Sequence, residues 1–394
     1  MLAIEERPVF DNTFVKWEYH THKPYASSTL GNNDEIRIPI SQQDTITCPA
    51  YSFLHITGKV SGKKTGGTTE ATVKLVNNAM AFLFEDMRYE ISGIEIDRTK
   101  NVGVTTTLKN ILSIREQEKR RLKTACWLGP GESREFKQFT FSIPLNMLFG
   151  FFEDYKKSII NVKQELILLR AATNNNALLS ADAATVDFEI TDLYWRVPHA
   201  TPNNRDKEKI LRKIERNETP EMPFRSWELH EYPTLPQTDR ISWTIKTSTQ
   251  MEKPRFVVLA FQTDRKNNMA KDMSVFDSCK LRDVKLYLNS NYYPYDNIRG
   301  DKTIFYEMFA DFQRAYYNEM NCPSLDYDEF VAKTPLYVID CSHQDDTLKS
   351  GPVDVRLDFE TTENFPAKTT AYCLLLHDSL VAYSLLTGNV KRMM

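Results

Sequence analysis

The chain has 394 residues, of which 41% are hydrophobic and 26% charged, and its formal net charge at pH 7 is −3. The balanced charge argues against a genome-coating protein, which normally carries a basic excess to displace counterions from phosphates, and it predicts no strong nucleic-acid binding. A chain of this length exceeds what one hydrophobic core usually supports, so two domains are expected.

The beginning of the chain, MLAIEERPVFDNTF, carries acidic residues early and no apolar run, so we expect no secretory signal peptide. No stretch approaches the roughly 20 apolar residues that a membrane-spanning helix needs. Six cysteines are scattered without a CxxC pair, at positions 48, 126, 279, 322, 341 and 373. They predict reduced, mostly buried thiols in a protein that is made in the cytoplasm or nucleus and is not secreted.

Strand patterns dominate the first 200 residues, because apolar residues alternate with polar ones or form short apolar runs. The segments are EIRIPIS (35–41), SFLHITGKVS (52–61), FLFEDMRYEISGIEID (82–97), FKQFTFSI (136–143), QELILLR (164–170) and TVDFEITDLYWRVP (185–198). Strands with this composition are typical of a protein built from packed sheets.

Few helices are predicted between these strands. Helical spacing of apolar residues indicates a helix over 105–123, and residues 146–159 form a second helical or irregular apolar segment. The run REQEKRRLK within the first is interpreted as a solvated helix end rather than a basic localisation patch, because Glu116 and Glu118 interrupt the positive charges.

After Pro198 the composition changes. Residues 199–223 place a short charged helix between prolines, which is typical of a connector between domains. Strand patterns then resume around a helix at 303–320, in segments 240–248, 255–263, 280–290, 335–342, 353–360 and 370–388. We therefore predict a first domain with an N-terminal arm (1–200), a charged connector (201–223) and a second domain (224–394).

The two halves share an internal repeat. Residues 86–112 align without a gap on residues 283–309. The identities, each 197 positions apart, are Asp86 with Asp283, Gly103 with Gly300 and Thr106 with Thr303. The order strand, strand, long strand, glycine turn, helix, further strands and final strand recurs in both halves. A period near 200 is too long for a solenoid or a propeller blade and indicates two whole domains of one architecture.

Each half therefore holds about eight short strands, which fits a sandwich, a barrel or a jelly roll. The jelly roll suits best, because its excursions between strands can carry a helix without disturbing the core. We predict an all-β protein of two consecutive eight-stranded jelly-roll sandwiches, a double jelly roll, with short helices in the inter-strand excursions.

Several blocks of the sequence resemble the major capsid proteins of Polinton/Maverick elements and their adintovirus-like relatives. The blocks are EIRIPI, FLHITGKV, YEISGIEIDRTKNVG, TLKNILS, IPLNMLFGFFEDYKKSIINVKQELILLRA and TVDFEITDLYWRVP. The chain is similar, more loosely, to the wider double jelly-roll capsid lineage of virophages, adenoviruses and tailless icosahedral phages. The likeness is strongest over residues 34–200. It rests on the order of the blocks and on their residue sequences rather than on a catalytic signature.

The resemblance implies two jelly rolls standing side by side in each chain, in a homotrimer that forms a pseudo-hexagonal capsomer. Such capsomers tile an icosahedral shell, with penton and minor capsid proteins and a packaging ATPase encoded elsewhere. The implied location is the virion, with no enzymatic activity and no cofactor.

An aromatic turn follows the predicted strand of the second half. Tyr292, Tyr293, Pro294 and Tyr295 supply contact area at a low cost in rotamer entropy. We therefore regard them as a candidate contact between the jelly rolls or between subunits. The alternative, that they only cover the end of their own sandwich, is equally open.

Two groups of residues resemble a metal site and a catalytic site, but the sequence supports neither. His20 and His22 would share one strand face, but no third ligand is evident nearby, so no metal site is expected. The triplet Cys341-Ser342-His343 precedes Asp345 and Asp346, yet catalytic groups are assembled by the fold rather than by adjacency. No catalytic residue is predicted.

Two glycine-containing stretches, GKKTGG (62–67) and GPGES (129–133), do not match a phosphate-binding loop and are interpreted as exposed excursions. Other functions stay open. A capsid-like host protein that no longer forms virions would share the sequence features, and jelly rolls also serve as glycan-binding modules. A cupin-type enzyme is poorly supported, because the seven histidines are dispersed at 20, 22, 55, 199, 230, 343 and 377.

Overall fold

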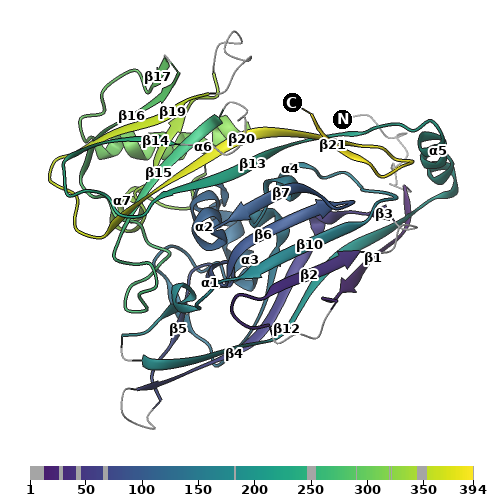
Figure 1. Cartoon of the computed structure of the whole chain (residues 1–394), viewed down its shortest axis with the longest axis horizontal. Coiled ribbons are helices and arrows are strands. Elements are labelled where there is room, and N and C mark those ends of the chain that lie inside the picture. Colours follow the sequence, from purple (N-terminus) through teal and green to yellow (C-terminus); the bar gives the residue numbers. More distant parts are fainter. Residues whose placement is uncertain are drawn as a thin grey trace, which may run out of the picture.

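The protein is described here by a computed structural model, which covers residues 13–25, 30–40, 46–64, 70–181, 183–245, 254–289, 291–318, 320, 322–343 and 353–393. Two pairs of antiparallel sheets, one pair from each half of the chain, lie side by side (Figure 1). The buried apolar side chains of both halves form one continuous core.

The first half builds one sheet in the order β1-β12-β4-β9 and another in the order β2-β10-β6-β7. The first sheet consists of β1 (Phe14–His22), β12 (Ala183–Pro202), β4 (Phe53–Lys64) and β9 (Gln138–Pro144). The second consists of β2 (Glu35–Ile40), β10 (Gln164–Arg170), β6 (Phe84–Ile91) and β7 (Ile94–Lys100). Four short strands complete this half: β3 (Ile46–Thr47), β5 (Lys74–Val76), β8 (Ser133–Glu135) and β11 (Leu178–Leu179).

The second half builds sheets in the orders β13-β20-β15-β18 and β14-β19-β16-β17. The first of these consists of β13 (Glu221–Tyr232), β20 (Thr369–Tyr383), β15 (Pro254–Thr263) and β18 (Tyr337–Asp340). The other consists of β14 (Arg240–Ile245), β19 (Val355–Thr361), β16 (Leu281–Leu288) and β17 (Asn291–Tyr293). A last strand, β21 (Val390–Met393), pairs with β20.

The two halves have the same connectivity. When the eight main strands of each half are counted in chain order, one sheet takes the first, eighth, third and sixth, and the other takes the second, seventh, fourth and fifth. This is a jelly roll, so the predicted double jelly roll and the duplication are confirmed. The register agrees as well, because corresponding rows of paired residues are Asp86–Leu169–Glu35 and Asp283–Glu360–Arg240.

Alternation along the strands sets which side chains enter the core. On β2, Ile36, Ile38 and Ile40 are buried, while Glu35 and Arg37 point to solvent. Because successive side chains of a strand point to opposite faces, one apolar residue in two is enough to fill a sheet that is open to water on its other face.

The predicted long strand over 82–97 is wrong, since it is a hairpin of β6 and β7. Ser92 and Gly93 form its turn with φ angles of 51° and 79°, the left-handed conformation that a tight two-residue hairpin requires. In the second half the chain turns at Asn289, where φ is 54°, and Tyr292 and Tyr293 lie in the return strand β17. The helix in each half therefore follows a hairpin and not a single strand.

The helices are α1 (Ala79–Phe82), α2 (Val102–Ser113), α3 (Glu116–Leu122), α4 (Gly150–Asp154), α5 (Asn204–Glu215), α6 (Lys302–Tyr317) and α7 (Tyr327–Lys333). The predicted helix at 105–123 is two helices, because Ile114 between them is extended. Helix α3 exposes its charged residues, as expected, and α7 was not predicted. Helix α5 lies between β12 and β13 and buries no residue. Among the described residues, no helix is long and apolar enough to span a membrane.

Candidate functional site: the interface between the two jelly rolls

The two jelly rolls meet along an interface formed by α2, α4 and β7 of the first and by β13 and α6 of the second. Figure 1 shows β13 and β7 as neighbouring strands at the boundary of the two halves. This set of elements is called the inter-jelly-roll interface below. It is rich in charged side chains that lie away from solvent, which were not predicted from the sequence.

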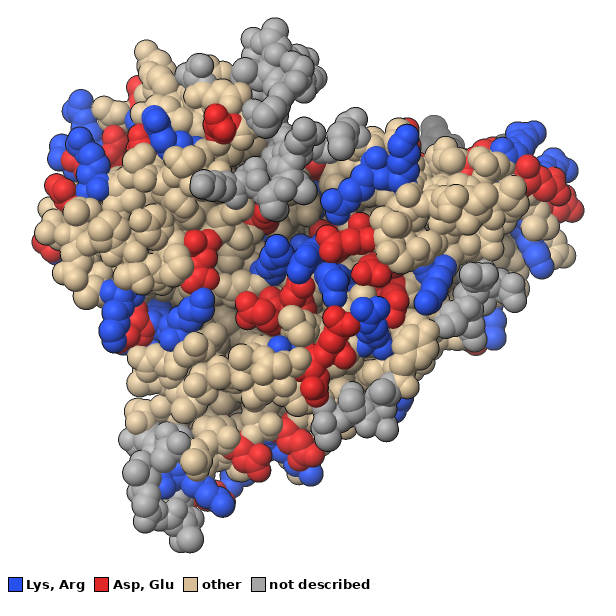
Figure 2. Space-filling view, viewed as in Figure 1, with Lys and Arg blue, Asp and Glu red and all other residues tan. Residues whose placement is uncertain are grey.

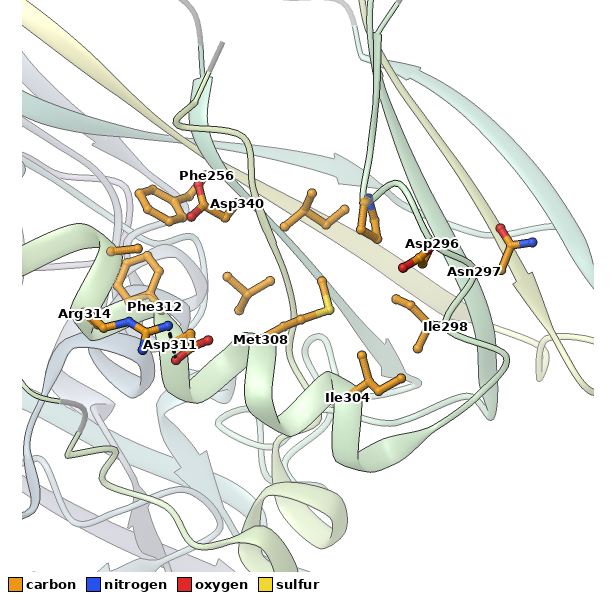
Figure 3. Close-up of a pocket in the computed structure, with 14 residues that line it drawn as sticks. Phe256, Asp296, Asn297, Ile298, Ile304, Met308, Asp311, Phe312, Arg314 and Asp340 are labelled. Carbon is orange, nitrogen blue, oxygen red and sulfur yellow. Dashed lines mark ion pairs between the residues drawn. The ribbon is translucent and has the colours of Figure 1, made fainter.

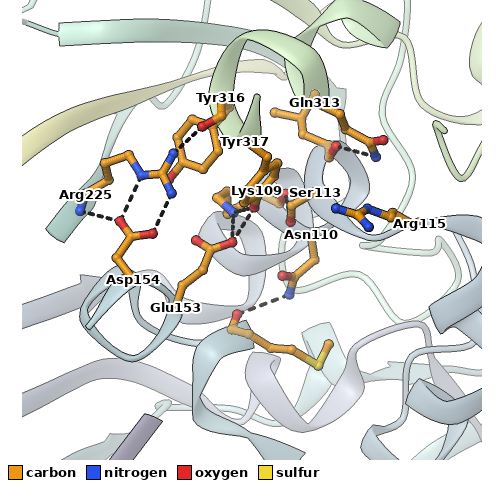
Figure 4. Close-up of polar contacts among 12 residues, drawn as sticks. Lys109, Asn110, Ser113, Arg115, Glu153, Asp154, Arg225, Gln313, Tyr316 and Tyr317 are labelled. Carbon is orange, nitrogen blue, oxygen red and sulfur yellow. Dashed lines mark hydrogen bonds and ion pairs between the residues drawn. The ribbon is translucent and has the colours of Figure 1, made fainter. Parts of the chain in front are cut away.

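Lys109 of α2 is the most deeply buried of these charges, with 1% of its side chain exposed. Its Nζ donates to Glu153 Oε1 at 3.0 Å and to the Tyr317 hydroxyl at 2.9 Å (Figure 4). It also lies 4.6 Å from the centre of the Trp227 ring. Burial lowers the pKa of Lys109, and the charge of Glu153 opposes that shift. The first jelly roll thus supplies the ion pair, and the second supplies the hydroxyl and rings around it.

Arg225 of β13 forms a second, parallel connection. Its Nε and backbone N–H each donate to Asp154 Oδ2 at 2.8 Å, and another guanidinium nitrogen donates to Oδ1. The guanidinium lies 3.7 Å from the centre of the Tyr316 ring. Burial is the largest single effect and lowers the pKa of Arg225, but the hydrogen bonds with Asp154 and the electrostatic attraction of the groups around the guanidinium together outweigh it, so the net shift is upward. A bidentate Arg–carboxylate pair fixes orientation as well as distance.

Helix α4 and strand β13 approach each other closely at the interface. A Cβ atom on Gly150 would lie 1.7 Å from the Arg225 carbonyl oxygen, so only glycine fits there. Nearby, the buried carboxylate of Asp97 accepts hydrogen bonds from the Phe151 N–H at 2.9 Å and from the Ser226 hydroxyl at 2.8 Å. Burial raises the pKa of Asp97.

Further polar contacts extend the interface. Gln313 donates to the Leu112 carbonyl at 3.2 Å, and Asn161 donates to the Leu385 carbonyl at 2.8 Å. Because buried charges stay stable only when their partners are held in place, this network fixes one relative orientation of the jelly rolls. The chain is therefore built as one rigid block.

The sequence-predicted contact residues lie elsewhere. Tyr292 and Tyr295 stack on each other with ring centres 6.1 Å apart, and Lys285 donates to the backbone carbonyls of Pro294 and Tyr295. These partners all belong to the second jelly roll. Tyr293 is partly buried and packs against the hydrophobic core. Tyr292 lies on β17, an edge strand of its sheet, and is 44% exposed, while Tyr295 follows the strand and is 81% exposed.

A groove of about 410 Å³ lies beside this edge strand (Figure 3). Its floor is apolar and its rim carries carboxylates. The lining includes Pro294, Ile298, Ile304, Met308, Phe312, Asp296, Asp311 and Asp340. Asp311 pairs with Arg314 at 3.0 Å. Helix α6 thus has one side at the inter-jelly-roll interface and another along this groove.

The structure brings a third histidine to the pair His20 and His22, which was not predicted from the sequence. His199 of β12 joins His20 and His22 of β1, with its ring stacked 4.2 Å from that of His20 and its Nε2 3.1 Å from that of His22. Burial lowers the pKa of His22 and of His199 to about 4. The sequence could not show this because the pairing joins residues 177 positions apart. No group of His, Cys, Asp and Glu within the described ranges has an arrangement that could hold a metal ion.

The Cys341-Ser342-His343 triplet and the two glycine-containing stretches were the other segments considered for chemistry. The Cys341 thiol is buried and donates to the Pro254 carbonyl at 3.2 Å, while Asp345 and Asp346 lie outside the described residues. Residues 65–67 of the first glycine stretch also lie outside them. The second stretch is only partly exposed, since Gly129 and Pro130 are buried.

The cysteines are mostly buried, as predicted. Four of the six are buried, Cys279 and Cys322 are partly exposed, and all six are free thiols. Burial raises the pKa of Cys126 to about 12, so this thiol stays protonated at neutral pH.

The outer face of the sheet β2-β10-β6-β7 carries interleaved charges. Figure 2 shows acidic and basic side chains alternating over the region where these strands lie in Figure 1. Glu35 accepts from Arg37 at 2.7 Å and from Arg88 at 3.1 Å, and Asp86 pairs with Arg98 at 2.7 Å. The pairs of Glu35 are solvent-exposed and contribute little stability, whereas Asp86 is buried beneath Arg98. The balanced signs suit a solvated face.

Comparison with known proteins agrees with the topology. A family model for the double jelly roll-like domain matches residues 73–381. The match spans well over half of the chain, so the chain belongs to this family of double jelly roll-like domain proteins. No curated protein matches the chain in sequence.

Solved structures of viral proteins share the fold. A chain of the Sputnik virophage matches with a TM-score of 0.67 at 9% identity, covering 100% of this chain and 91% of its own. VP54 of the virus PBCV-1 matches with a TM-score of 0.64 at 11% identity, covering 98% and 99%. The Faustovirus major capsid protein matches with a TM-score of 0.63 at 9% identity, covering 96% and 92%. At these identities the likeness shows the fold alone.

Proposed function

We propose that the protein is a structural major capsid protein and not an enzyme. The observation that carries the proposal is the inter-jelly-roll interface, which joins two sandwiches of identical connectivity into one block through the Arg225–Asp154 ion pair and the hydrogen bond from Lys109 to Tyr317. A shell built from such blocks would place two equivalent sandwiches per chain around each capsomer. The likeness in fold to the Faustovirus major capsid protein over most of both chains supports the same function.

In this proposal three chains close into a homotrimer with six jelly rolls, a pseudo-hexagonal capsomer that tiles an icosahedral shell in the virion. Penton and minor capsid proteins are the proposed partners. The division into residues 1–200, 201–223 and 224–394 and the assignment to the Polinton/Maverick group are part of the same proposal. The contact role of Tyr292, Tyr293, Pro294 and Tyr295 belongs to it as well, between subunits rather than within the chain.

Light scattering on the purified protein after size-exclusion chromatography tests the proposal, followed by electron microscopy of the same fractions. We expect trimers at micromolar concentration, and hexagonal arrays or hollow shells when the protein is concentrated. A strict monomer with affinity for glycans would contradict the capsid function and favour a glycan-binding module. Trimers that never form arrays or shells would indicate a capsid-like host protein that no longer forms virions.

A further inference from the structure

The contact within the chain shows which surfaces of two jelly rolls fit together. At the inter-jelly-roll interface, β7 of the first jelly roll lies against β13 of the second, and the two strands are joined by the hydrogen bond from Ser226 to Asp97. In chain order, β7 is the fifth main strand of its jelly roll and β13 is the first main strand of the other. The interface therefore pairs a fifth strand with a first strand.

The same pair of surfaces occurs a second time in each chain without meeting. The fifth strand of the second jelly roll is β17, and the first strand of the first jelly roll is β1. Figure 1 shows these two strands on opposite sides of the molecule, so they cannot contact each other in one chain. Both are edge strands of their sheets, with β17 paired to β16 and β1 paired to β12.

Both strands expose apolar side chains. On β1, Val15, Trp17 and Tyr19 are 74%, 42% and 40% exposed. On β17 Tyr292 is also exposed, as is Tyr295 two residues after the strand. Large exposed aromatics on two edge strands of a soluble protein are typical of an interaction surface rather than of a solvated one.

The charges near the two strands are complementary. The groove beside β17 is lined by Asp311 and Arg314, which pair with each other, and it has the exposed carboxylates of Asp296 and Asp340 on its rim. On β1, Lys16 and Glu18 pair with each other at 2.8 Å. Next to β1, the exposed guanidinium of Arg196 lies 5.0 Å from the centre of the Tyr19 ring, so beyond the paired charges the groove side is acidic and the β1 side basic. An aromatic strand with a basic side chain matches an apolar groove with an acidic rim in both character and sign.

We propose that β17 and its adjoining groove bind β1 of a second copy of this chain, in the same fifth-to-first arrangement that joins the two jelly rolls within a chain. The contact is head to tail, so it repeats from copy to copy and closes into a ring when the rotation allows. The inference rests on the proposed function, which it deepens by naming the surfaces that meet between subunits.

A disulfide cross-link tests the pairing. A variant with Tyr19→Cys and Tyr292→Cys should give covalent dimers and trimers after mild oxidation, on a gel run without reductant. Mixing the Tyr19→Cys and Tyr292→Cys single variants should give covalent dimers that contain one chain of each kind. The matched control is Thr140→Cys with Tyr292→Cys, because Thr140 lies on β9, the opposite edge of the sheet that contains β1. This control should stay uncross-linked, as should the parent protein with its partly exposed Cys279 and Cys322.

A second variant guards against an unfavourable cross-linking geometry. Replacing the exposed Trp17 by Ser should weaken trimer formation by roughly tenfold or more, the usual effect of removing an aromatic anchor at the centre of an interface. Its thermal unfolding as a monomer should match that of the parent. Trimers that resist both the cross-link and Trp17→Ser would overturn this pairing and leave the proposed function standing. A protein that stays monomeric under all conditions would overturn both.

Discussion

The strands β4 and β15 hold the same place in the two jelly rolls but have different surroundings. On β4, buried and partly exposed residues alternate, and His55 on the outer face stacks on Tyr194 at 4.5 Å beside solvent. On β15 nearly every residue is buried, because Phe256 packs on Phe312 of α6 while Phe261 packs on Phe359 inside the sandwich. Identical connectivity thus supports both a half-exposed and a fully covered sheet.

The difference between β4 and β15 arises from the elements that cover the outer face of each sheet. Helix α6 and the first jelly roll cover the outer face of the β15 sheet within the chain, whereas the outer face of the β4 sheet stays open. The sequence reflects these two environments. The covered strand β15 is the apolar run PRFVVLAFQT, and the half-exposed strand β4 is the alternating segment FLHITGKVSGKK.

A buried charge on the covered face gives the sharpest test of this contrast. Val258 is fully buried on the α6 side of β15, so Val258→Asp should lower the free energy of unfolding by about 4 kcal/mol or more, since the charge has no partner there. The matched change on β4 is Thr57→Asp, at a partly exposed outer position, which should cost less than about 1 kcal/mol. Urea unfolding followed by circular dichroism measures both. Equal effects would contradict the difference between the sheets.

The inter-jelly-roll interface can be weakened from inside. Lys109→Ala leaves Glu153 buried without its cation and should cost about 3 kcal/mol in unfolding free energy. Lys119→Ala, which breaks an ion pair with the largely exposed Glu116, should cost less than about 1 kcal/mol. Differential scanning calorimetry compares the two. A small effect of Lys109→Ala would mean that the network does not hold the halves together.

The close approach at Gly150 offers a steric test of the same interface. Gly150→Ala should cost about 2 kcal/mol, because the added methyl group collides with the Arg225 backbone. Gly93→Ala, at the exposed β6–β7 turn, meets no atom within 4 Å and should cost about 1 kcal/mol through its left-handed φ alone. Thermal unfolding ranks the variants, and the reverse order would rule out tight packing at the interface.

The stability contributed by the histidines that lie between β1 and β12 should depend on pH. The pKa values of His22 and His199 are about 4 in the folded protein and about 6.5 when unfolded, so only the unfolded chain gains protons in between. Their contribution is therefore complete above pH 6.5 and is lost as the pH falls toward 4, by on the order of 1 kcal/mol after allowing for solvent screening.

The double variant His22→Gln with His199→Gln isolates this effect from that of His55, His230 and His377, whose pKa values burial also lowers. Its urea midpoint should change less between pH 7 and pH 5 than that of the parent. His343→Gln, at an exposed position, serves as the control and should behave as the parent does. Identical pH dependence in the double variant and the parent would contradict the prediction.

Much of the fold could be predicted because strand patterns are local signals and the repeat can be found by aligning the sequence with itself. The aligned pair Gly103 and Gly300 shows the limit of such signals. Gly103 is needed because Phe82 packs where its Cβ would be, whereas Gly300 adopts a φ of 77°. The same letter at the same place therefore serves two different purposes.

The charged network could not be predicted in the same way. Lys109 and Tyr317 are 208 positions apart, and only the packing of α2 on α6 brings them together. The one available signal was a lysine inside the apolar segment TTTLKNILS, which a solvated helix face explains equally well. The aromatic turn expected at Tyr292 is instead the return strand β17 of a hairpin, and the role of Tyr292 between subunits stays a prediction.

A cryo-electron microscopy map of the assembled protein tests the central claim most directly. We expect six jelly rolls around a three-fold axis, with β1 of each subunit lying along β17 and the groove of its neighbour. A ring in which β1 faces solvent, or in which β17 meets a different element, would contradict it.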